Sequence, residues 1–257
     1  MIEFKPKIFR TVNEIPQFHK RLMVLQHLGL GDHFICRGII EEISSRVLSL
    51  YIVCKAQNHA TLSSLISSLG NAFSVPVINL SDGTSEISIA YDLCHKLACD
   101  LFVIGHNSEV RQSRFDRDFF EHTSLPFQIR YLSYTNFVYP RANLAVEMLV
   151  QTLPRRFVLV QTGSSRGELP INLTGVSGYE VLVDHSLGDN MLNWMHIAHL
   201  ATAIHCVPSS FYCMIDSFAN SLHADLVLHE NRLDFCLNPN NEFNLMKWKR
   251  IHYDTKL

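Results

Sequence analysis

The 257-residue sequence lacks the excess of positive charge that would suit a nucleic-acid ligand. It contains 22 Lys and Arg against 24 Asp and Glu, which gives a formal net charge of -2. The cationic residues are scattered, apart from a short group at 247–250. Because binding to a phosphate backbone requires clustered Lys and Arg, we expect no nucleic acid among the partners.

Long hydrophobic runs and paired cysteines are also missing. No stretch approaches the roughly 20 apolar residues of a membrane-spanning helix, and the first ten residues are too charged for a secretion signal. We therefore expect no transmembrane segment and a cytoplasmic location. The 7 cysteines form no CxxC pair, and most lie within apolar runs, so we expect buried, reduced thiols.

Two common phosphate-binding motifs are absent as well. The sequence has no GKS or GKT, and the glycine pair Gly29 and Gly31 does not complete a dinucleotide-binding fingerprint. That fingerprint has a small residue where Phe34 stands, and an acidic residue at the end of the next strand, which here ends at Cys54 and Lys55. The sequence thus argues against a nicotinamide or flavin, and we expect no cofactor.

What the sequence does contain is an alternation of short apolar runs with longer amphipathic stretches. This alternation is typical of βα units that form a parallel sheet covered by helices. The predicted strands are Leu22–Leu28, Leu48–Cys54, Val75–Leu80, Leu101–Gly105, Phe157–Gln161, Glu180–Asp184, Ala203–Val207 and Asp225–Leu228. The predicted helices are Asp32–Arg46, His59–Leu69, Ser85–Ala98, Pro140–Leu153, Asn190–Ala201 and Pro208–Leu222.

The alternation is interrupted by a polar segment, Gly105–Arg130, and then resumes. The interruption indicates two Rossmann-like lobes with parallel sheets, residues 1–135 and 136–257, which we expect to face each other across a cleft. We expect the last segment, Pro239–Leu257, to pack back across the first lobe. Ligands of such sheets bind outside the carboxyl ends of the strands, so the residues that follow each apolar run are the informative ones.

A glycine loop follows the first predicted strand. Gly29 and Gly31 permit a sharp turn and a close approach of a ligand, and the helix after them offers free N–H groups to an anion. Asp32 lies where a general base would face the cleft. His33 and His27 are alternative bases, because an unperturbed histidine titrates near neutrality. The competing interpretation is a tight turn in which Asp32 only caps the helix.

A second candidate site follows the predicted strand that ends at Val207. Pro208 fixes the turn, and the hydroxyl residues Ser209 and Ser210 stand at the entrance of a helix. Two hydroxyls and a helix N-terminus are suited to bind phosphate oxygens. The alternative is an ordinary serine N-cap with no ligand.

The loop Gln161–Gly167 is the third candidate, because it combines glycines, hydroxyls and one cation. Arg166 is suited to bind a diphosphate by forked hydrogen bonds, whereas the competing interpretation is a solvated loop. His196, His199 and His205 have no carboxylate or cysteine at ligand spacing, so we expect no metal site.

Two of these segments resemble a known group of proteins. The stretch His27–Ile40 resembles the amino-terminal loop of glycosyltransferase-like proteins from bacterial polysaccharide gene clusters, and it is more distantly similar to the Leu-Gly-Asp turn of heptosyltransferases. Ile204–Cys206 with Ser209–Phe211 resembles a motif near the carboxyl end of the same proteins. The matches, in order along the chain, are Leu28–His33, Ile35–Cys36, Gly38–Ile39, Phe115–Asp116 with Phe119, Arg141 with Glu147, Ser165–Gly167, Ile204–Cys206 and Ser209–Phe211.

This resemblance implies a two-lobe GT-B architecture and an inverting, metal-independent glycosyl transfer. It places a nucleotide-sugar donor on the second lobe and a saccharide or glycolipid acceptor near the first. Carried over by position, Asp32 is the catalytic base with His33 beside it. The residues expected to bind substrates are His27, Gly29, Gly31, Arg166, His205, Ser209, Ser210 and Phe211.

The sequence departs from the family pattern at three places. Arg37 stands where Asn is expected, Pro208 where an acidic residue is expected, and Gln161–Thr162 where His and Asp are usual. The last two departures affect the expected donor site and support an alternative, a non-catalytic GT-B-like module that binds a nucleotide sugar or saccharide. A third hypothesis is a nucleotide-dependent sugar-modifying enzyme such as an epimerase. The sequence leaves a homo-oligomer open.

Overall fold

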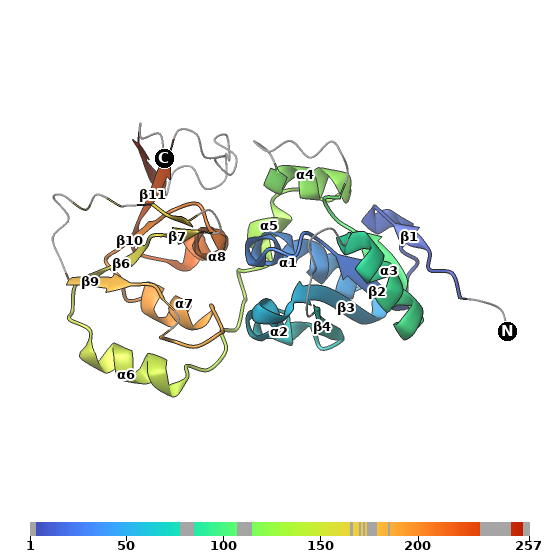
Figure 1. The fold of residues 1–257 in the computed structure, drawn as a ribbon, viewed down its shortest axis with the longest axis horizontal. Coiled ribbons are helices and arrows are strands. Elements are labelled where there is room, and N and C mark those ends of the chain that lie inside the picture. Colours follow the sequence, from blue (N-terminus) through green and yellow to red (C-terminus); the bar gives the residue numbers. More distant parts are fainter. Residues whose placement is uncertain are drawn as a thin grey trace. The chain divides into compact units, whose positions relative to one another are not determined.

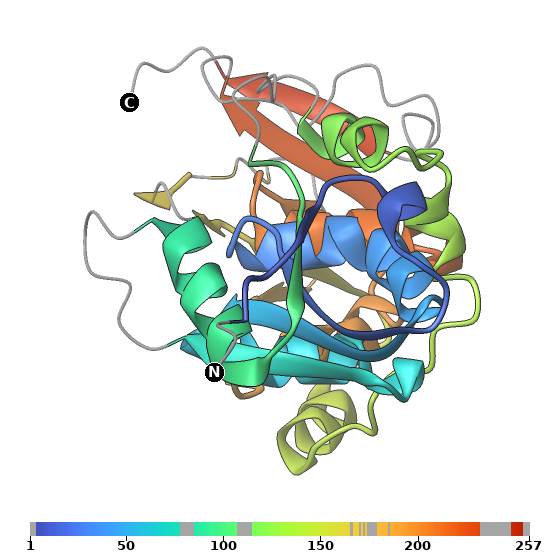
Figure 2. The same cartoon turned by 90° about the vertical axis from the view of Figure 1, so that its right-hand side faces the viewer.

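The computed structural model divides the chain into two compact units, residues 1–137 and 138–257, which are described separately (Figure 1). Figure 2 shows the same ribbon turned by 90° about the vertical axis. The described residues are 4–77, 85–106, 115–164, 167–169, 171, 173, 179–184, 186–231 and 248–253.

The first unit is built on a five-stranded parallel sheet with the order β1-β5-β2-β3-β4. Its strands are β1 (Ile8–Phe9), β2 (His19–Leu25), β3 (Val47–Lys55), β4 (Ala72–Val77) and β5 (Asp100–Val103). The chain runs outward from β2 to β3 and β4, and then returns to β5 on the other side of β2. The strand order therefore reverses between β2 and β5, which is the kind of place where open α/β sheets bind ligands.

Helices connect these strands and cover the sheet. The helices of this unit are α1 (Leu30–Ser44), α2 (His59–Leu65), α3 (Glu86–Leu97), α4 (Phe115–His122) and α5 (Ile129–Leu132), with 3₁₀ turns η1 (Val12–Glu14), η2 (Ala56–Asn58) and η3 (Ser67–Leu69). Met23 and Leu25 of β2 pack in a buried cluster with Ala90 and Cys94 of α3. Leu22 and Val24, which point to the opposite face, are fully buried as well. Burial on both faces explains why the second half of β2, Leu22–Leu25, is an uninterrupted apolar run.

The sequence pattern did not predict α4 and α5, which lie in and at the end of the polar segment Gly105–Arg130. Two charges in the described part of this segment are paired inside the first unit. Arg130 Nη1 lies 2.7 Å from Asp116 Oδ2, and both side chains are 1% exposed. Arg37 of α1 likewise donates to the carbonyl oxygens of Ser133 and Leu65. Polar residues of this segment therefore take part in a buried network of ion pairs and hydrogen bonds.

The second unit repeats the pattern, with a five-stranded parallel sheet in the order β12-β11-β10-β6-β9. Its strands are β6 (Phe157–Gln161), β9 (Tyr179–Leu182), β10 (Ala203–Cys206), β11 (Asp225–Asn231) and β12 (Trp248–Tyr253), besides a small antiparallel pair, β7 (Gly163–Ser164) and β8 (Gly167–Glu168). Its helices are α6 (Leu144–Thr152), α7 (Asn193–Ala198) and α8 (Ser210–Phe218), with the 3₁₀ turn η5 (Ala219–Ser221). The strand order reverses between β6 and β10.

The predicted α/β class with two parallel sheets is confirmed, whereas one predicted helix begins at a different residue. The described part of the last segment, Trp248–Tyr253, forms a strand that pairs with β11 in the second sheet. The helix predicted from Pro140 begins at Leu144, because the Asn143 side chain accepts a hydrogen bond from the Val146 N–H and caps the helix.

The structure also bears on the expectations about membranes and cysteines. Among the described residues, no helix combines the length and the apolar character needed to cross a bilayer. The cysteines of the described part, Cys36, Cys54, Cys94, Cys99, Cys206 and Cys213, are all buried. Cys236 lies outside the described residues.

The packing of α1 against α5 depends on Gly38. A Cβ at this position would lie 2.5 Å from the backbone oxygen of Ile129. Alanine favours a helix by about 1 kcal/mol over glycine, but overpacking of this contact should outweigh that gain. We expect Gly38→Ala to lower the free energy of unfolding in urea by about 2 kcal/mol. Gly163→Ala, whose Cβ would meet nothing closer than 3.9 Å, is the control, and equal effects of the two would contradict the prediction.

Candidate functional site

The first candidate site lies at the carboxyl edge of the first sheet, at the loop between β2 and α1. Gly29 is the N-cap of α1, and Asp32 is in the first turn. A Cβ on Gly29 would lie 2.6 Å from Asp32 Oδ2, so the carboxylate lies over the glycine, and its pKa reflects a hydrogen bond with the Gly29 backbone N–H. Asp32 thus helps to cap the helix from its third position, in the manner of a capping box, while Gly29 rather than Asp32 is the N-cap.

The surroundings of Asp32 change its proton affinity. Burial, and next the nearby charge of Glu86, raise the pKa of Asp32 to about 7, although the Gly29 N–H and Lys55 favour the charged form. Its side chain keeps some accessible surface, so a ligand can reach it. A carboxyl group with a pKa near neutrality at the carboxyl edge of a parallel sheet is suited to accept and release a proton.

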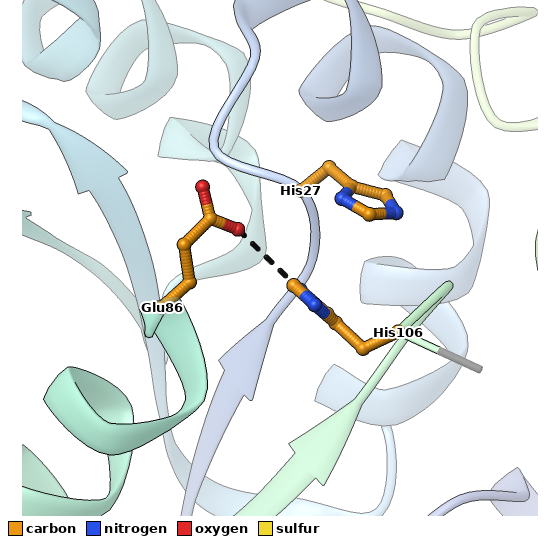
Figure 3. Close-up of side chains that lie close together, drawn as sticks. All are labelled: His27, Glu86 and His106. Carbon is orange, nitrogen blue, oxygen red and sulfur yellow. Dashed lines mark ion pairs between the residues drawn. The ribbon is translucent and has the colours of Figure 1, made fainter. Parts of the chain in front are cut away.

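Next to this loop, the structure brings together three residues from separate elements. His27 follows β2, His106 follows the neighbouring strand β5, and Glu86 opens α3. Figure 3 shows the two imidazole rings beside each other, with the Glu86 carboxylate directed at His106. One potential ligand atom from each residue lies within 4.8 Å of the other two. These residues could hold a metal ion, and the sequence identified His27 alone, as a substrate-binding residue.

His33, the second predicted catalytic residue, is buried behind the loop. Its side chain is 1% exposed, and its Nδ1 hydrogen-bonds with the side-chain amide of Gln26. Burial lowers the pKa of His33 to about 3. The ring is therefore neutral at physiological pH and lies against the end of β2, where it can hold the loop in place.

The second candidate site lies at the strand reversal of the second unit. Gln161 ends β6, and its side-chain oxygen accepts a hydrogen bond from Ser209 Oγ at 2.9 Å. Ser209 is the N-cap of α8, where its side chain accepts from the Tyr212 N–H at 3.2 Å. Ser210, the first residue of α8, is partly exposed beside this cap. Ser209 is therefore engaged within the protein, whereas Ser210 and the helix N-terminus are the groups placed to meet an anion.

Two further predicted residues of this unit are buried. Phe211 is 2% exposed. His205 Nδ1 lies 2.8 Å from His229 Nε2, and His229 Nδ1 lies 2.6 Å from the Tyr253 hydroxyl. The resulting chain of hydrogen bonds crosses from β10 to β12. The sequence could not reveal it, because strand β12 was not predicted.

The remaining predicted positions are less informative. Arg166 and Ser165 lie outside the described residues. His196 donates from Nε2 to the Pro140 carbonyl oxygen at 3.0 Å, and the His199 ring packs 5.2 Å from that of Tyr139. His196 of α7 and His199, the C-cap of that helix, thus have contacts within the second unit.

Comparison with known proteins gives distant structural matches only. One solved structure, described as the bacterial iron-containing dodecameric glycosyltransferase TibC from enterotoxigenic E. coli H10407, matches with a TM-score of 0.43 and 9% identity, over 84% of this chain and 59% of that chain. Another, described as dodecameric iron-containing heptosyltransferase TibC in complex with ADP-D-beta-D-heptose, has a TM-score of 0.44 and the same identity and coverage.

The chain therefore spans less than two thirds of the length of these structures. The similarity to these structures is distant, and the chain itself contains two five-stranded parallel sheets. No protein-family model matches the sequence, and neither does any curated protein.

The raised pKa of Asp32 predicts how its replacement changes stability with pH. The folded state keeps the Asp32 proton up to pH about 7, whereas the unfolded chain loses it near pH 4. Within this window the folded state binds more protons, so this group lowers the free energy of unfolding as pH rises. Asparagine has a similar shape, can still accept from the Gly29 N–H, and does not titrate.

The free energy of unfolding of Asp32→Asn, minus that of the unmodified protein, should therefore increase by about 2 kcal/mol from pH 5 to pH 8. Urea unfolding of both proteins at the two pH values measures this increase. Asp92→Asn, at an exposed position of α3, is the control. A stability difference for Asp32→Asn that stays constant with pH would show that its pKa is not raised.

Proposed function

We propose that the chain is a glycosyltransferase that moves a sugar from a nucleotide-sugar donor to a saccharide or glycolipid acceptor. The observation that carries the proposal is Asp32, a partly buried carboxyl group at the strand reversal of the first sheet whose pKa is raised to about 7. Transfer to a hydroxyl requires a base that removes a proton as the new bond forms, and such a base works best with a pKa near the operating pH. The transfer is proposed to be inverting, with Asp32 as the base.

The donor is proposed to bind the second unit, where the chemistry is complementary. The N-terminus of α8 supplies backbone N–H groups, and the Ser210 hydroxyl lies beside them. We propose that these groups, with Arg166, stabilise the charge of the leaving diphosphate electrostatically and need no metal ion at the donor. The Gln161–Ser209 hydrogen bond holds the turn that presents this helix end.

Donor binding can be tested by thermal shift in EDTA with UDP, GDP, CDP, ADP and their common sugar conjugates. A ligand at a hundredfold excess over its Kd stabilises by about 2.7 kcal/mol, so we expect a clear rise in Tm with one nucleotide family. Arg166→Ala and Ser210→Ala should abolish the shift, whereas Arg155→Ala, at an exposed position before β6, should retain it. A shift that survives both site variants would exclude this donor site.

The role of Asp32 is tested by turnover of the donor identified in that screen. Release of the nucleoside diphosphate, with water replacing the acceptor, is the basal reaction. We expect Asp32→Asn to lower its rate by about 10² to 10⁴-fold with an unchanged Kd for the donor. The rate of the unmodified protein should fall as pH decreases below about 7, because the base must be ionised. Full activity of Asp32→Asn would remove Asp32 from the mechanism.

One observation favours a second candidate, a non-catalytic module that binds a nucleotide sugar or saccharide. Gln161 is one of the departures from the family pattern, and Ser209 follows another, Pro208. The side chains of Gln161 and Ser209 hydrogen-bond to each other, and neither is ionisable. This candidate predicts stabilisation by a ligand with neither sugar transfer nor donor hydrolysis. Detection of nucleotide release that depends on Asp32 decides against it.

A further inference from the structure

His27, Glu86 and His106 form a group of electron-pair donors at the strand reversal of the first sheet. The pairing of β2 with β5 places Leu25 opposite Val103, so the residues that follow the two strands leave the sheet at the same edge. Glu86 reaches this edge from the first turn of α3. The group is therefore assembled by the sheet topology from parts of the chain that are far apart in sequence.

The hydrogen bonds of the two histidines determine which nitrogen carries a lone pair. His27 Nε2 lies 2.9 Å from the Gly105 carbonyl oxygen. A carbonyl only accepts, so Nε2 carries the proton, and Nδ1 has the lone pair. His106 has a hydrogen bond with the backbone of Gln26, while its Nε2 is buried and has no hydrogen-bond partner among the described residues.

His106 Nε2 faces another acceptor. Glu86 Oε2 lies 3.6 Å from it, which is too long for a hydrogen bond. One ligand atom from each of the three residues lies within 4.8 Å of the other two, and lone pairs held this close to a carboxylate repel one another when nothing lies between them. A cation between them would satisfy all three.

The ligand types and the separation of Glu86 from His106 fit a transition-metal ion. Two ligands about 2.0–2.2 Å from a tetrahedral ion lie about 3.3–3.6 Å apart, and the observed separation of Glu86 and His106 is 3.6 Å. Metal-binding histidines usually donate their other ring N–H to a backbone carbonyl or carboxylate, as His27 does to Gly105. Two imidazoles favour ions such as Zn²⁺ or Co²⁺ over Mg²⁺ and Ca²⁺, which prefer oxygen.

The backbone at Gly105 is fitted to this arrangement. Its φ is +75°, and a Cβ would lie 2.2 Å from the Phe119 ring and 3.2 Å from the His27 ring. The His27 ring is held between those of His106, at a centroid distance of 4.5 Å, and Phe119, at 5.8 Å. Only glycine lets the carbonyl oxygen and the ring approach in this way, so His27 is rigidly oriented.

We propose that His27, Glu86 and His106 bind one divalent transition-metal ion of the zinc class in the first unit. Three protein ligands leave at least one coordination position for water or for an oxygen of a bound ligand, as in catalytic rather than structural zinc sites. The proposal is independent of the proposed glycosyl transfer, in which the metal-free step concerns the donor diphosphate at the second unit.

The test is direct metal binding to the full chain after EDTA has been removed by dialysis. Co²⁺ is the spectroscopic probe, because its visible d–d bands report four- or five-coordinate binding, and Zn²⁺ is titrated calorimetrically. We expect one Co²⁺ per chain, displaced by one equivalent of Zn²⁺, and no comparable binding of Mg²⁺. His27→Ala, His106→Ala and Glu86→Gln should each weaken Zn²⁺ binding at least tenfold and abolish the d–d bands.

Two controls keep the outcome interpretable. His223→Ala removes an exposed histidine of the second unit and should leave the Co²⁺ spectrum unchanged. Glu86→Gln keeps the shape of a partly exposed side chain, 30% accessible, so it tests the site even if replacing a histidine disturbs folding. Absence of d–d bands in the unmodified protein, or bands that persist in Glu86→Gln with unchanged Zn²⁺ affinity, would overturn the proposal.

Discussion

The reversal of strand order in each parallel sheet is the constraint on which the candidate sites depend. In the first unit, β2 lies between β3, which follows it in the chain, and β5, which returns from the far edge. The loops that follow β2 and β5 therefore leave the sheet at the same edge. The second unit has the same reversal between β6 and β10, where Cys206 pairs with Gln161. Both groups of residues that the sequence singled out follow strands at these reversals, because that is where a parallel sheet exposes its strand ends.

The buried sheet also determines the electrostatics of the first site. Because both faces of β2 are covered, the groups at its end are removed from much of the surrounding water, which disfavours their charged forms. The effect is opposite for acids and bases: it raises the pKa of Asp32 to about 7 and lowers that of His106 to about 4. The raised pKa of Asp32 lowers the free energy of unfolding near neutral pH. Functional positions often lower stability in this way.

The sequence predicted the parts of the structure that depend on local patterns. Apolar runs separated by amphipathic stretches predicted the parallel strands, and the glycines before Asp32 predicted the turn into α1. It did not predict α4, because the polar composition of this segment breaks the alternation, and the pairing of Asp116 with Arg130 inside the unit depends on the tertiary structure. Nor did it associate Glu86 and His106 with His27. Each is an ordinary residue in its local sequence, and only the pairing of β2 with β5 and the packing of α3 bring the three together.

The two strand reversals are alike in topology but differ in chemistry. The first has a carboxyl group with a near-neutral pKa, two imidazoles and a second carboxyl group, which are groups that move protons or bind cations. The second has an amide, hydroxyls and a helix N-terminus, which are uncharged groups that bind anions without exchanging protons. A module that only binds a ligand has no need of the first set, whereas transfer to a hydroxyl needs a base in one place and anion stabilisation in another. The presence of proton-exchanging groups in the first unit and anion-binding groups in the second therefore supports the proposed catalysis over binding alone.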